Sequence, residues 1–290
     1  MDSAVGLVKK LSSVRSDRIG SEIMFSQIGF FKSLPFPISP SPNEAWGLKP
    51  VLFKIGDFPI ESYPVMLFLA LLVGIGIYVW QLKKDGIKSS NAFYIALFGI
   101  VGGIIGAKLP LIFMYWNEIN SNTNSLNAVL QGRTIVGGLI GGSVSILIAK
   151  RIFNIKERMG NQLAIPIAVA MAIGRVGCLL RGCCYGKETH IAWGIDFGDH
   201  ILRHPTQIYE IMFDIAMVIY LSLRKRKGVK PGQLYSIFLN GYLSFRFLLE
   251  FIRAEKVSFI ILTDFQILCI VGLLFINRKY LISIFMRREV

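Results

Sequence analysis

Residues 160–186 have the sequence GNQLAIPIAVAMAIGRVGCLLRGCCYG. An α-helix needs about 20 residues to cross ~30 Å of hydrocarbon, so the apolar run 160–180 predicts a membrane-spanning helix, with Arg175 inside it. The stretch ends in glycines and cysteines and opens into a polar segment that closes with Arg203-His204-Pro205-Thr206-Gln207. A chain built only to span a bilayer needs neither an intramembrane arginine nor this segment, so we expect a functional site here.

The composition indicates an integral membrane protein. Of the 290 residues, 53% are hydrophobic, and the mean hydropathy is +0.55, which is too apolar for an ordinary soluble domain. The net charge of +14 would suit a nucleic-acid-binding protein. The basic residues lie in short clusters between apolar runs, however, which argues against nucleic acid as a partner. Four cysteines are too few for a disulfide scaffold.

Seven apolar runs approach the length of a membrane span. They are residues 63–81, 92–115, 134–153, 160–180, 206–223, 233–252 and 259–277. Backbone groups must be satisfied inside a bilayer, so we predict an all-α fold with about seven transmembrane helices. The run 134–153 is the weakest, because Gly137, Gly138, Gly141 and Gly142 lower its helix propensity. Glycines at this spacing also let helices approach closely.

Lysine and arginine alternate between the loops and predict the orientation. They are dense after the first, third and fifth runs, where residues 224–227 are RKRK, and at the C-terminus. The positive-inside rule therefore places the N-terminus outside and the C-terminus in the cytoplasm. Residues 174–186 then lie at the outer face.

Residues 1–55 are predicted to be a polar, basic extension, either flexible or interfacial, and residues 56–290 the membrane domain. The extension has four prolines between residues 35 and 42 and no apolar run long enough to span. It also lacks the apolar middle of a cleaved signal peptide. A start codon upstream of the true one is an alternative explanation.

Arg175, Arg246 and Glu250 are the clearest ionisable residues within the runs. Arg246 and Glu250 are four residues apart, so they share a helix face and are placed to pair. With Arg181 and Arg203, the two span arginines would form an outward-opening cationic pocket. The planar guanidinium suits a phosphate, such as a lipid headgroup. The alternative is a structural Arg246–Glu250 pair with Arg175 extending to the interface.

The cysteine cluster allows several interpretations. Cys178, Cys183, Cys184 and His190 would supply four metal ligands, but their spacing matches no common zinc pattern. Adjacent Cys183 and Cys184 are also poorly placed to bind one tetrahedral ion together. We therefore predict no metal and interpret the cysteines as small packing residues, with a redox or nucleophilic thiol as the alternative.

The three histidines lie in the polar segment. His204 precedes Pro205 at a predicted helix start, where it is either a proton acceptor near neutral pH or a structural residue that orients the helix. His190 and His200 are predicted to be solvated loop residues.

The chain resembles the bacterial prolipoprotein diacylglyceryl transferases over about residues 55–280. The motifs that carry the resemblance occur in order: Gly137-Gly138-Leu139-Ile140-Gly141; Gly174-Arg175-Val176-Gly177; Arg203-His204-Pro205-Thr206-Gln207-Ile208-Tyr209-Glu210; and, as the fourth, Gly241-Tyr242 together with Phe245-Arg246 and Glu250-Phe251-Ile252-Arg253. Four ordered motifs are much more specific than any one alone. The seven-span, outside-to-inside layout agrees with that family.

The resemblance implies a reaction. The family moves the diacylglyceryl group of phosphatidylglycerol to the thiol of a lipobox cysteine in the signal peptide of a preprolipoprotein. The products are a thioether-linked lipid and glycerol 1-phosphate. The expected location is the bacterial cytoplasmic (inner) membrane, the partners are membrane lipids and the preprolipoprotein, and no metal or dissociable cofactor is implied.

The resemblance also implies roles for residues. Arg175 and Arg246 would bind the phosphate, Glu250 would orient Arg246, and His204 completes the expected catalytic set. The residues expected to bind substrate are Tyr63, Gly137, Gly138, Gly186, Arg203, Gln207, Tyr209 and Glu210.

Four positions depart from the family pattern. Val136 stands where a histidine is usual, Cys178 replaces an asparagine, Cys183 an acidic residue, and Lys108 an arginine. If the family histidine activates the acceptor thiol, His204 or a nearby carboxylate would have to replace it, or the acceptor differs. Lys108 either extends to the interface or joins the pocket.

Two other functions are compatible with the sequence. A divergent paralogue would transfer a phospholipid-derived group to another acceptor. A non-enzymatic lipid-binding or transport protein would also carry intramembrane charges, but the chain has no convincing internal repeat of the kind many transporters show.

Overall fold

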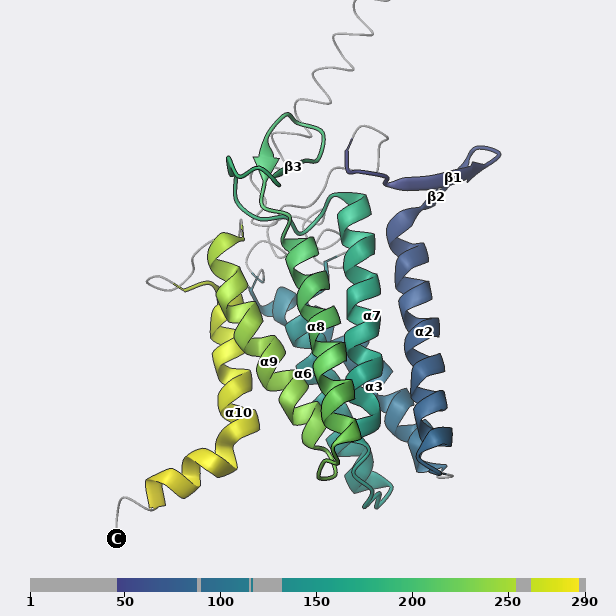
Figure 1. Cartoon of the computed structure of the whole chain (residues 1–290), viewed down its shortest axis with the longest axis vertical. Coiled ribbons are helices and arrows are strands. Elements are labelled where there is room, and N and C mark those ends of the chain that lie inside the picture. The colour runs from purple at the N-terminus through teal and green to yellow at the C-terminus, as the bar shows by residue number, and fades with distance from the viewer. Residues whose placement is uncertain (1–45, 88–89, 115, 117–131, 254–261, 287–290) are drawn as a thin grey trace, which may run out of the picture.

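The structure, a computed structural model, describes residues 46–87, 90–114, 116, 132–253 and 262–286. This part of the chain is a bundle of long helices with loops and two small hairpins at one end (Figure 1). The helices are α2 (Ser62–Lys84), α3 (Asn91–Met114), α6 (Ile135–Ile152), α7 (Gly160–Arg181), α8 (Thr206–Arg226), α9 (Gln233–Leu249) with the 3-10 turn η1 (Glu250–Ile252), and α10 (Asp264–Met286). Each of the seven predicted runs thus overlaps one long helix, and α10 continues beyond the end of its run to Met286.

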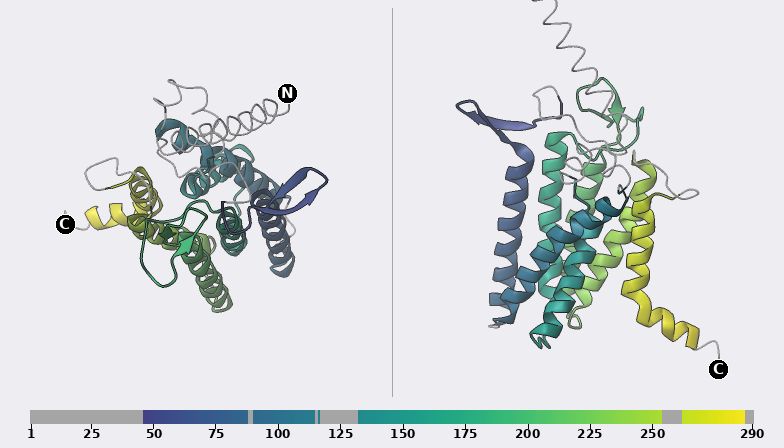
Figure 2. Two further views of the ribbon diagram at one scale, coloured as in Figure 1. Left: turned by 90° about the horizontal axis from the view of Figure 1, so that it is seen from above. Right: turned by 180° about the vertical axis from the view of Figure 1, so that it is seen from behind.

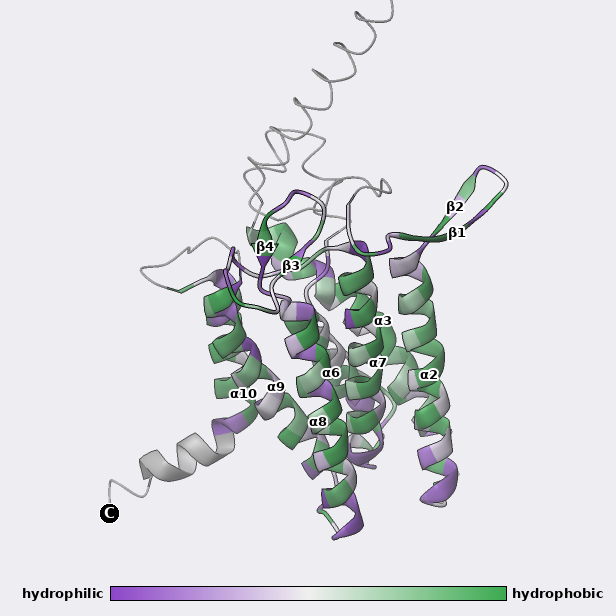
Figure 3. Cartoon of the chain, turned by 45° about the horizontal axis from the view of Figure 1, so that its top comes forward, coloured by the Kyte–Doolittle hydropathy of each residue, from purple (hydrophilic) through white to green (hydrophobic). Residues whose placement is uncertain are grey.

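Five of the described helices, α2, α3, α6, α7 and α8, are long and apolar enough to cross a membrane. The helices are hydrophobic along most of their length and hydrophilic at their lower ends (Figure 3). Large apolar side chains cover the outside of the bundle, where Phe68, Ile104 and Phe113 are 62%, 63% and 75% exposed. Soluble proteins rarely expose so large an apolar surface to water, so the fold is that of a multi-pass membrane protein.

Helix α7 lies in the middle of the bundle (Figure 2). It packs against α2, α8 and α9, while α3 pairs with α6 and α10 packs against α9 and α6. Because α7 carries Arg175 and ends in the glycine–cysteine stretch, the arrangement puts this part of the sequence at the centre of the molecule.

Glycines bring α3 and α6 into backbone contact, as their spacing predicts. A Cβ atom added to Gly106 would lie 2.6 Å from the Gly137 carbonyl oxygen and 2.6 Å from the Gly141 Cα atom. No other residue fits such a crossing. The glycines that weaken run 134–153 as an isolated helix therefore stabilise it in the bundle.

The hydrophobic core is built from α6, α7, α8, α9 and α10. Its buried members are Val136, Leu139, Ala164, Ala168, Leu221, Leu234, Phe238, Leu239, Tyr242, Leu243 and Cys269. Helix α9 supplies five of them, at spacings that keep one face inward. That inward face continues to Arg246, which is how a charged side chain at the end of α9 comes to be buried.

The loops between α7 and α8 form a cap over the upper end of the bundle (Figure 1). The cap holds the antiparallel pair β3 (Ile195–Asp196) and β4 (Leu202–Arg203). A second antiparallel hairpin, β1 (Val51–Ile55) and β2 (Phe58–Glu61), leads into α2. Apart from these short strands and η1, the regular structure of the described residues is α-helical, in agreement with the all-α prediction.

The predicted extension, residues 1–55, lies mostly outside the described residues. The part that is described joins the cap. The Trp46 indole nitrogen donates to the Gly182 carbonyl oxygen at 2.9 Å, and the Gly47 nitrogen donates to Phe197 at 2.7 Å.

Candidate active site

A continuous chain of ion pairs joins α7, α8 and the end of α9. Arg175 Nη2 lies 2.5 Å from Glu210 Oε2, and Arg246 Nη2 lies 2.7 Å from Glu250 Oε2. Arg253 connects the two pairs, with its Nη1 3.8 Å from Glu210 Oε1 and its Nε 3.7 Å from Glu250 Oε2. We call these five residues the arginine network. The pairing of Arg246 with Glu250, expected from their spacing, is confirmed.

The arginine network is nearly closed to solvent. Glu210 and Glu250 are 0% and 2% exposed, and the three arginines are 5% or 6% exposed. Buried ions cost several kcal/mol each unless they are paired. Three arginines and two glutamates leave one excess positive charge among these paired groups, so the network is suited to a bound monoanion.

Two nitrogen atoms of the network face no acceptor. Arg175 Nε and Arg246 Nη1 are buried without a hydrogen-bond partner among the described residues. The Arg246 guanidinium instead lies over the Phe265 ring, 5.9 Å from its centroid. A buried donor without an acceptor costs about 1–3 kcal/mol, and an oxygen-rich ligand would satisfy both nitrogens.

Two more polar side chains of the spans adjoin Glu210. The Tyr242 hydroxyl donates to Glu210 Oε2 at 3.4 Å. Asp214, one turn further along α8, is 0% exposed, and neither carboxylate oxygen has a hydrogen-bond partner within the described part of the chain. It is close enough to Glu210 and Arg175 to interact electrostatically with both. The site therefore contains a buried carboxylate that no arginine contacts directly.

Helix α7 ends in a Schellman motif that turns the chain into the cap. Gly182 adopts the left-handed conformation, with φ at 72°. Its nitrogen donates to the Leu179 carbonyl oxygen, and the Cys183 nitrogen donates to that of Cys178. A residue without a Cβ atom takes this conformation most readily, which explains the glycine directly after Arg181.

The chain after this turn is tied to the arginine network. The Cys183 carbonyl oxygen accepts a hydrogen bond from Gln207 Nε2 at 2.6 Å. The Cys184 carbonyl oxygen accepts one from Thr206 Oγ1 at 2.6 Å and one from Arg253 Nη1 at 3.0 Å. The start of α8 and the end of η1 therefore hold the cysteine segment. Gln207, predicted to bind substrate, has a positioning contact here.

Gly186 allows the cap to approach the end of η1. Its nitrogen donates to the His204 carbonyl oxygen at 2.8 Å, and it forms an isolated bridge with Arg253. A Cβ atom at this position would lie 2.6 Å from the Ile252 carbonyl oxygen. Glycine is required here for backbone approach, and this approach positions Arg253.

Three cysteines gather at the end of α7 and the start of the cap. The sulfur atoms of Cys178, Cys183 and Cys184 lie within 4.8 Å of one another, although Cys183 and Cys184 are adjacent in the sequence. Cys184 has a left-handed backbone conformation here, with φ of 64°. Hydrogen bonds donated by the other two thiols hold the pKa of Cys184 well below its ordinary value, and Arg253 adds to the effect. His190 is exposed and not part of this cluster.

Tyr63 lies in a second cationic group. Arg133 Nη1 donates to the Tyr63 hydroxyl at 3.3 Å. The guanidinium carbons of Arg133 and Arg181 lie 5.6 and 5.7 Å from the Tyr63 ring centroid. Lys108 is within electrostatic range of Arg133, and Tyr63 within that of Cys178. This group of side chains therefore lies near the cysteine cluster.

The other predicted cap residues contact one another. Arg203 donates two hydrogen bonds to the Asp199 carboxylate, at 2.6 and 2.5 Å, which hold the pKa of Asp199 below its ordinary value. His204 Nδ1 lies 3.3 Å from the Tyr209 hydroxyl, which also accepts a hydrogen bond from the Trp193 indole at 2.9 Å. These contacts belong to the cap and not to the arginine network.

The family described as prolipoprotein diacylglyceryl transferase matches residues 50–280 of this sequence. The chain belongs to this family. The match extends over most of the described residues and includes every member of the arginine network.

Relatives that carry the family's name are similar over most of their length. A phosphatidylglycerol–prolipoprotein diacylglyceryl transferase of Clostridium tetani (strain Massachusetts / E88) is 34% identical over 217 residues, which cover 72% of this chain and 86% of that protein. A protein of the same name from Dehalococcoides mccartyi (strain ATCC BAA-2100 / JCM 16839 / KCTC 5957 / BAV1) is 30% identical over 218 residues, with coverages of 71% and 82%. One from Clostridioides difficile (strain 630) is 28% identical over 226 residues, with coverages of 77% and 91%.

The position that departs most from the family pattern is part of the core. Val136 is 1% exposed and packs in the same cluster as Leu139 and Tyr242. The neighbouring Gly137 and Gly138 lie against α3, so the structure gives these two predicted substrate-binding glycines a packing contact. A valine side chain accepts no proton, and any proton acceptor in this family member lies elsewhere.

Sequence reasoning missed three residues of the site. Arg253, quoted above only as part of a motif, was given no role, although it stands three residues after Glu250 and seven after Arg246, a spacing that keeps residues on one helical face. Asp214 is an intramembrane carboxylate, and the rule that singled out Arg175 applies to it equally. Arg133 was counted as a loop charge, and no local signal connects it to Tyr63, which is 70 residues away.

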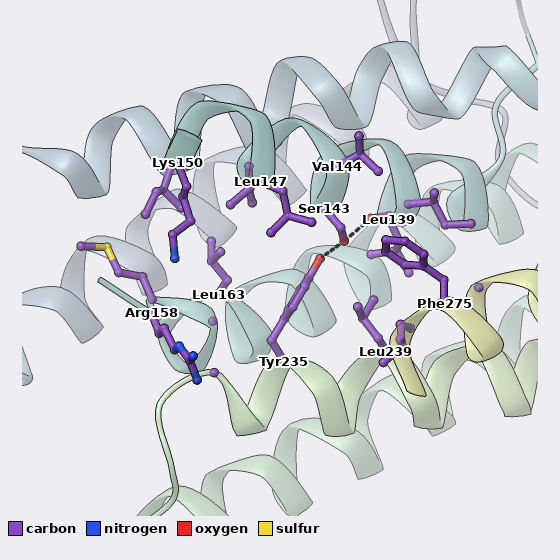
Figure 4. A pocket seen from close by; sticks show the side chains of 18 of the residues that line it. Leu139, Ser143, Val144, Leu147, Lys150, Arg158, Leu163, Tyr235, Leu239 and Phe275 are labelled. Atoms are coloured by element: carbon purple, nitrogen blue, oxygen red, sulfur yellow. Dashed lines mark hydrogen bonds between the residues drawn. The ribbon is translucent and has the colours of Figure 1, made fainter. Parts of the chain in front are cut away.

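A separate cavity of about 680 Å³ lies at the other end of the bundle, between α6, α9 and α10 (Figure 4). Its walls are mostly apolar and include Leu139, Leu147 and Leu239. The Ser143 and Tyr235 hydroxyls form a hydrogen bond of 2.8 Å within it. Lys150, Arg158 and Arg278 also line this cavity, but none of the arginine network does. The cavity suits an aliphatic chain and offers no group for the transfer chemistry.

Proposed function

We propose that the protein transfers the diacylglyceryl group of phosphatidylglycerol to the thiol of a lipobox cysteine in the signal peptide of a preprolipoprotein. The similar proteins described above carry the name of this activity. In this chain the arginine network is the observation that supports it. A buried cluster with one excess positive charge and free guanidinium donors is what a phosphodiester requires.

The phosphate of phosphatidylglycerol fits the arginine network in charge and geometry. A phosphodiester carries one negative charge, which equals the excess of the network. Guanidinium groups donate charge-assisted hydrogen bonds to phosphate oxygens. Two such donors, Arg246 Nη1 and Arg175 Nε, have no hydrogen-bond acceptor among the described residues. Glu250 and Glu210 keep the two arginines fixed before the lipid arrives, so little reorganisation is needed during reaction.

The reaction requires one bond to form and one to break. The acceptor sulfur, as thiolate, attacks the glyceryl carbon that bears the phosphate and forms a carbon–sulfur bond. The carbon–oxygen bond breaks, and its electron pair stays on the phosphate oxygen of the leaving glycerol 1-phosphate. Negative charge grows on that phosphate as the bond breaks, and Arg175 and Arg246 stabilise it most in the transition state.

The acceptor thiol must lose its proton, because the thiolate is the nucleophile. Val136 cannot take the proton, and we assign this role to Asp214. Its buried carboxylate has no hydrogen-bond partner among the described residues and lies near Glu210 and Arg175. His204 is the second candidate. Its contact with Tyr209 in the cap gives it a structural function that would account for it without catalysis.

We further propose seven membrane spans, with the N-terminus outside and the C-terminus in the cytoplasm of a bacterium, in its inner membrane. Helices α9 and α10 would add to the five long spans. The basic ends of α2, α6 and α8 then face the cytoplasm. The arginine network and the cap lie toward the outer face, where a signal peptide presents its lipobox.

The test is transfer in phosphatidylglycerol vesicles supplied with a lipobox peptide. The purified protein is expected to release glycerol phosphate and to produce lipidated peptide in equal amounts. Arg246→Ala should lower the rate by about 10²–10³-fold, as loss of one transition-state donor does elsewhere. Arg246→Lys keeps the positive charge but lacks the planar guanidinium group, which donates two hydrogen bonds to one phosphate, and should retain a small part of the rate.

Arg151→Gln is the matched control. Arg151 is an exposed arginine near the opposite end of the bundle, and its loss should leave transfer unchanged. Full activity of Arg246→Ala would contradict the assigned role of Arg246. Release of glycerol phosphate without peptide lipidation would contradict the assigned acceptor.

One observation favours a second candidate, transfer to a different acceptor. Val136, Cys178 and Cys183 stand at three positions that depart from the family pattern, while Arg175, Arg246 and Glu250 agree with it. Complementation separates the candidates. If this gene alone restores lipoprotein maturation in bacteria depleted of their own transferase, the lipobox cysteine is an acceptor and the alternative is rejected.

A further inference from the structure

We propose that Cys178, Cys183 and Cys184 bind a thiophilic d¹⁰ metal ion such as Zn²⁺, and that the thiol of the acceptor occupies its fourth coordination position. The second half of this inference rests on the proposed function, while the first half does not. All three sulfur atoms already lie within 4.8 Å of one another. With zinc–sulfur bonds of about 2.3 Å, tetrahedral ligands are ~3.8 Å apart, so closure needs a movement of about 1 Å.

The backbone builds this cluster by two local features. The Schellman turn at Gly182 brings Cys183 back to Cys178 in the last turn of α7, since residues at these two positions normally contact each other in this motif. The left-handed backbone at Cys184, with φ of 64°, then brings the third sulfur to the same place. That conformation is unfavourable for a residue with a Cβ atom and persists where its surroundings enforce it. Here the enforcing contacts are those of Thr206 and Arg253 with the Cys184 carbonyl oxygen.

The surrounding charges suit an anionic metal–thiolate centre. Three thiolates around a divalent ion carry one net negative charge. Arg175 Nη1 lies 3.9 Å from Cys178 Sγ, and Arg253 contacts the backbone of Cys184. Soft thiolate ligands select zinc or copper(I) over magnesium or calcium. The ligand type therefore indicates the class of ion.

The fourth position is where the cluster meets the proposed chemistry. His190 is exposed and does not join the cluster, so the three ligands found among the described residues leave one position open, as catalytic zinc sites do. A thiol bound there loses its proton outright, which Asp214 would accept. The resulting thiolate lies beside Arg175, the residue assigned to the lipid phosphate. It then attacks the glyceryl carbon as described above, and the ion leaves the products unchanged.

This assignment also accounts for the departures from the family pattern. Val136 removes a histidine that would act on the acceptor thiol. Cys178 and Cys183, at two other departing positions, supply two of the three sulfur ligands. A loss of one means of thiol activation and a gain of another thus occur in the same molecule.

Cadmium titration of the full-length protein in detergent tests the site itself. We expect one Cd²⁺ per chain, detected by the ultraviolet charge-transfer absorption of cadmium thiolates. Each of Cys178→Ser, Cys183→Ser and Cys184→Ser should weaken binding at least tenfold. Cys269→Ser is the control, because Cys269 is a buried free cysteine in α10, outside the cluster. Equal binding by the wild type and all three cluster variants would overturn the site.

Counting thiols separates the metal site from a disulfide. The wild-type protein, denatured in the presence of a chelator, should show four free thiols. A count of two, with loss of Cd²⁺ binding, would mean that two cluster cysteines are bonded to each other, and the inference would be wrong. Thermal unfolding of each variant in parallel shows whether lost binding reflects lost folding. Cys183→Ala, which removes the sulfur without adding a polar atom, repeats the test if Cys183→Ser does not fold.

Transfer assays test the role of the ion. Removal of metal by a chelator should lower lipobox-peptide lipidation at least tenfold, and Zn²⁺ should restore it, in the wild type and in Cys269→Ser alike. An unchanged rate in protein shown to be metal-free would overturn acceptor activation and leave the proposed function standing. No lipidation by metal-loaded protein would reject the proposed function, while the cadmium titration would still decide the site.

Discussion

Two groups of three basic side chains, one toward each end of the bundle, differ in their surroundings. At the upper end, Arg175, Arg246 and Arg253 are buried and joined through two glutamates. At the lower end, Lys150, Arg158 and Arg278 line an apolar cavity of about 680 Å³. The number of basic side chains is the same in the two groups, so this number alone does not define a catalytic site.

What differs is how fixed the charges are before a ligand arrives. The arginine network holds its guanidinium groups through short carboxylate contacts in a place that excludes water. At the cavity, Lys150 donates to the Glu157 carbonyl oxygen at 2.7 Å, and Arg158 and Arg278 are exposed. Charges held in low dielectric act strongly on a reacting phosphate, whereas exposed ones are screened. The apolar cavity and the proposed chemistry thus lie apart.

Removing Glu210 should produce the largest effect, because it breaks two contacts of the arginine network at once. Glu210→Gln leaves Arg175 and Arg253 without their shared carboxylate. Loss of one partner from a buried ion pair costs about 3–5 kcal/mol. We expect a large fall in thermal stability and loss of detectable lipid transfer.

Thermal unfolding in detergent, followed by transfer in vesicles, measures both effects. Tyr235→Phe is the comparison at the cavity, where it removes one neutral hydrogen bond worth about 0.5–1.5 kcal/mol. If Glu210→Gln were no less stable than Tyr235→Phe, the arginine network would not be the rigid element that distinguishes the two ends.

The next effect concerns the proton acceptor. Asp214→Asn should lower the transfer rate by about 10²–10⁴-fold, the usual contribution of a positioned acid or base. Stability should change little, because no hydrogen bond of Asp214 is lost among the described residues. His204→Gln should keep most of the rate. Vesicle assays on both variants decide between them, and the opposite ranking would move the role to the cap histidine.

Two tyrosines on α9 allow a finer comparison, because their hydroxyl groups form hydrogen bonds toward opposite ends of the bundle. Tyr242 donates to Glu210 at 3.4 Å, and Tyr235 pairs with Ser143 at 2.8 Å. Tyr242→Phe should lower the transfer rate several-fold, because it frees the carboxylate that fixes Arg175. Tyr235→Phe should leave the rate unchanged, as measured in the same vesicles. Equal rates would mean that the long Tyr242 contact has no part in positioning Glu210.

Local spacing was enough to predict part of this site. The apolar runs gave the helices, and the four-residue spacing of Arg246 and Glu250 gave their pairing, because both follow from helix geometry. The placement of Arg175 in a span marked it as a site residue. Its partner could not be predicted in this way, because Glu210 lies on another helix and their contact depends on how α7 packs against α8.

Proximity in sequence did not predict which side chains lie together. Arg203, predicted to join the cationic pocket, pairs with Asp199, four residues earlier. Cys183 and Cys184, predicted to be poorly placed for one tetrahedral ion, have sulfur atoms within 4.8 Å of each other and of Cys178, and Cys184 has a left-handed backbone angle. Such backbone angles depend on tertiary contacts and have no signal in the local sequence, so they cannot be predicted from it.

The smallest predicted effect comes from the ion pair in the cap, which contrasts with the buried pair of Arg175. Asp199 and Arg203 have side chains that are 32% and 14% exposed, and pairs near the surface contribute about 0–1 kcal/mol. Asp199→Asn should therefore change the unfolding temperature slightly and leave lipid transfer intact.

The two hydrogen bonds from Arg203 lower the pKa of Asp199, so the pair stabilises the fold fully at pH values above the ordinary aspartate pKa of about 3.9. That contribution is lost as pH falls through the lowered pKa. The difference in unfolding temperature between the wild type and Asp199→Asn should therefore disappear as the pH falls below the lowered pKa of Asp199. Unfolding curves that stay equally far apart at neutral and acid pH would mean that the pair does not stabilise the cap through its charge.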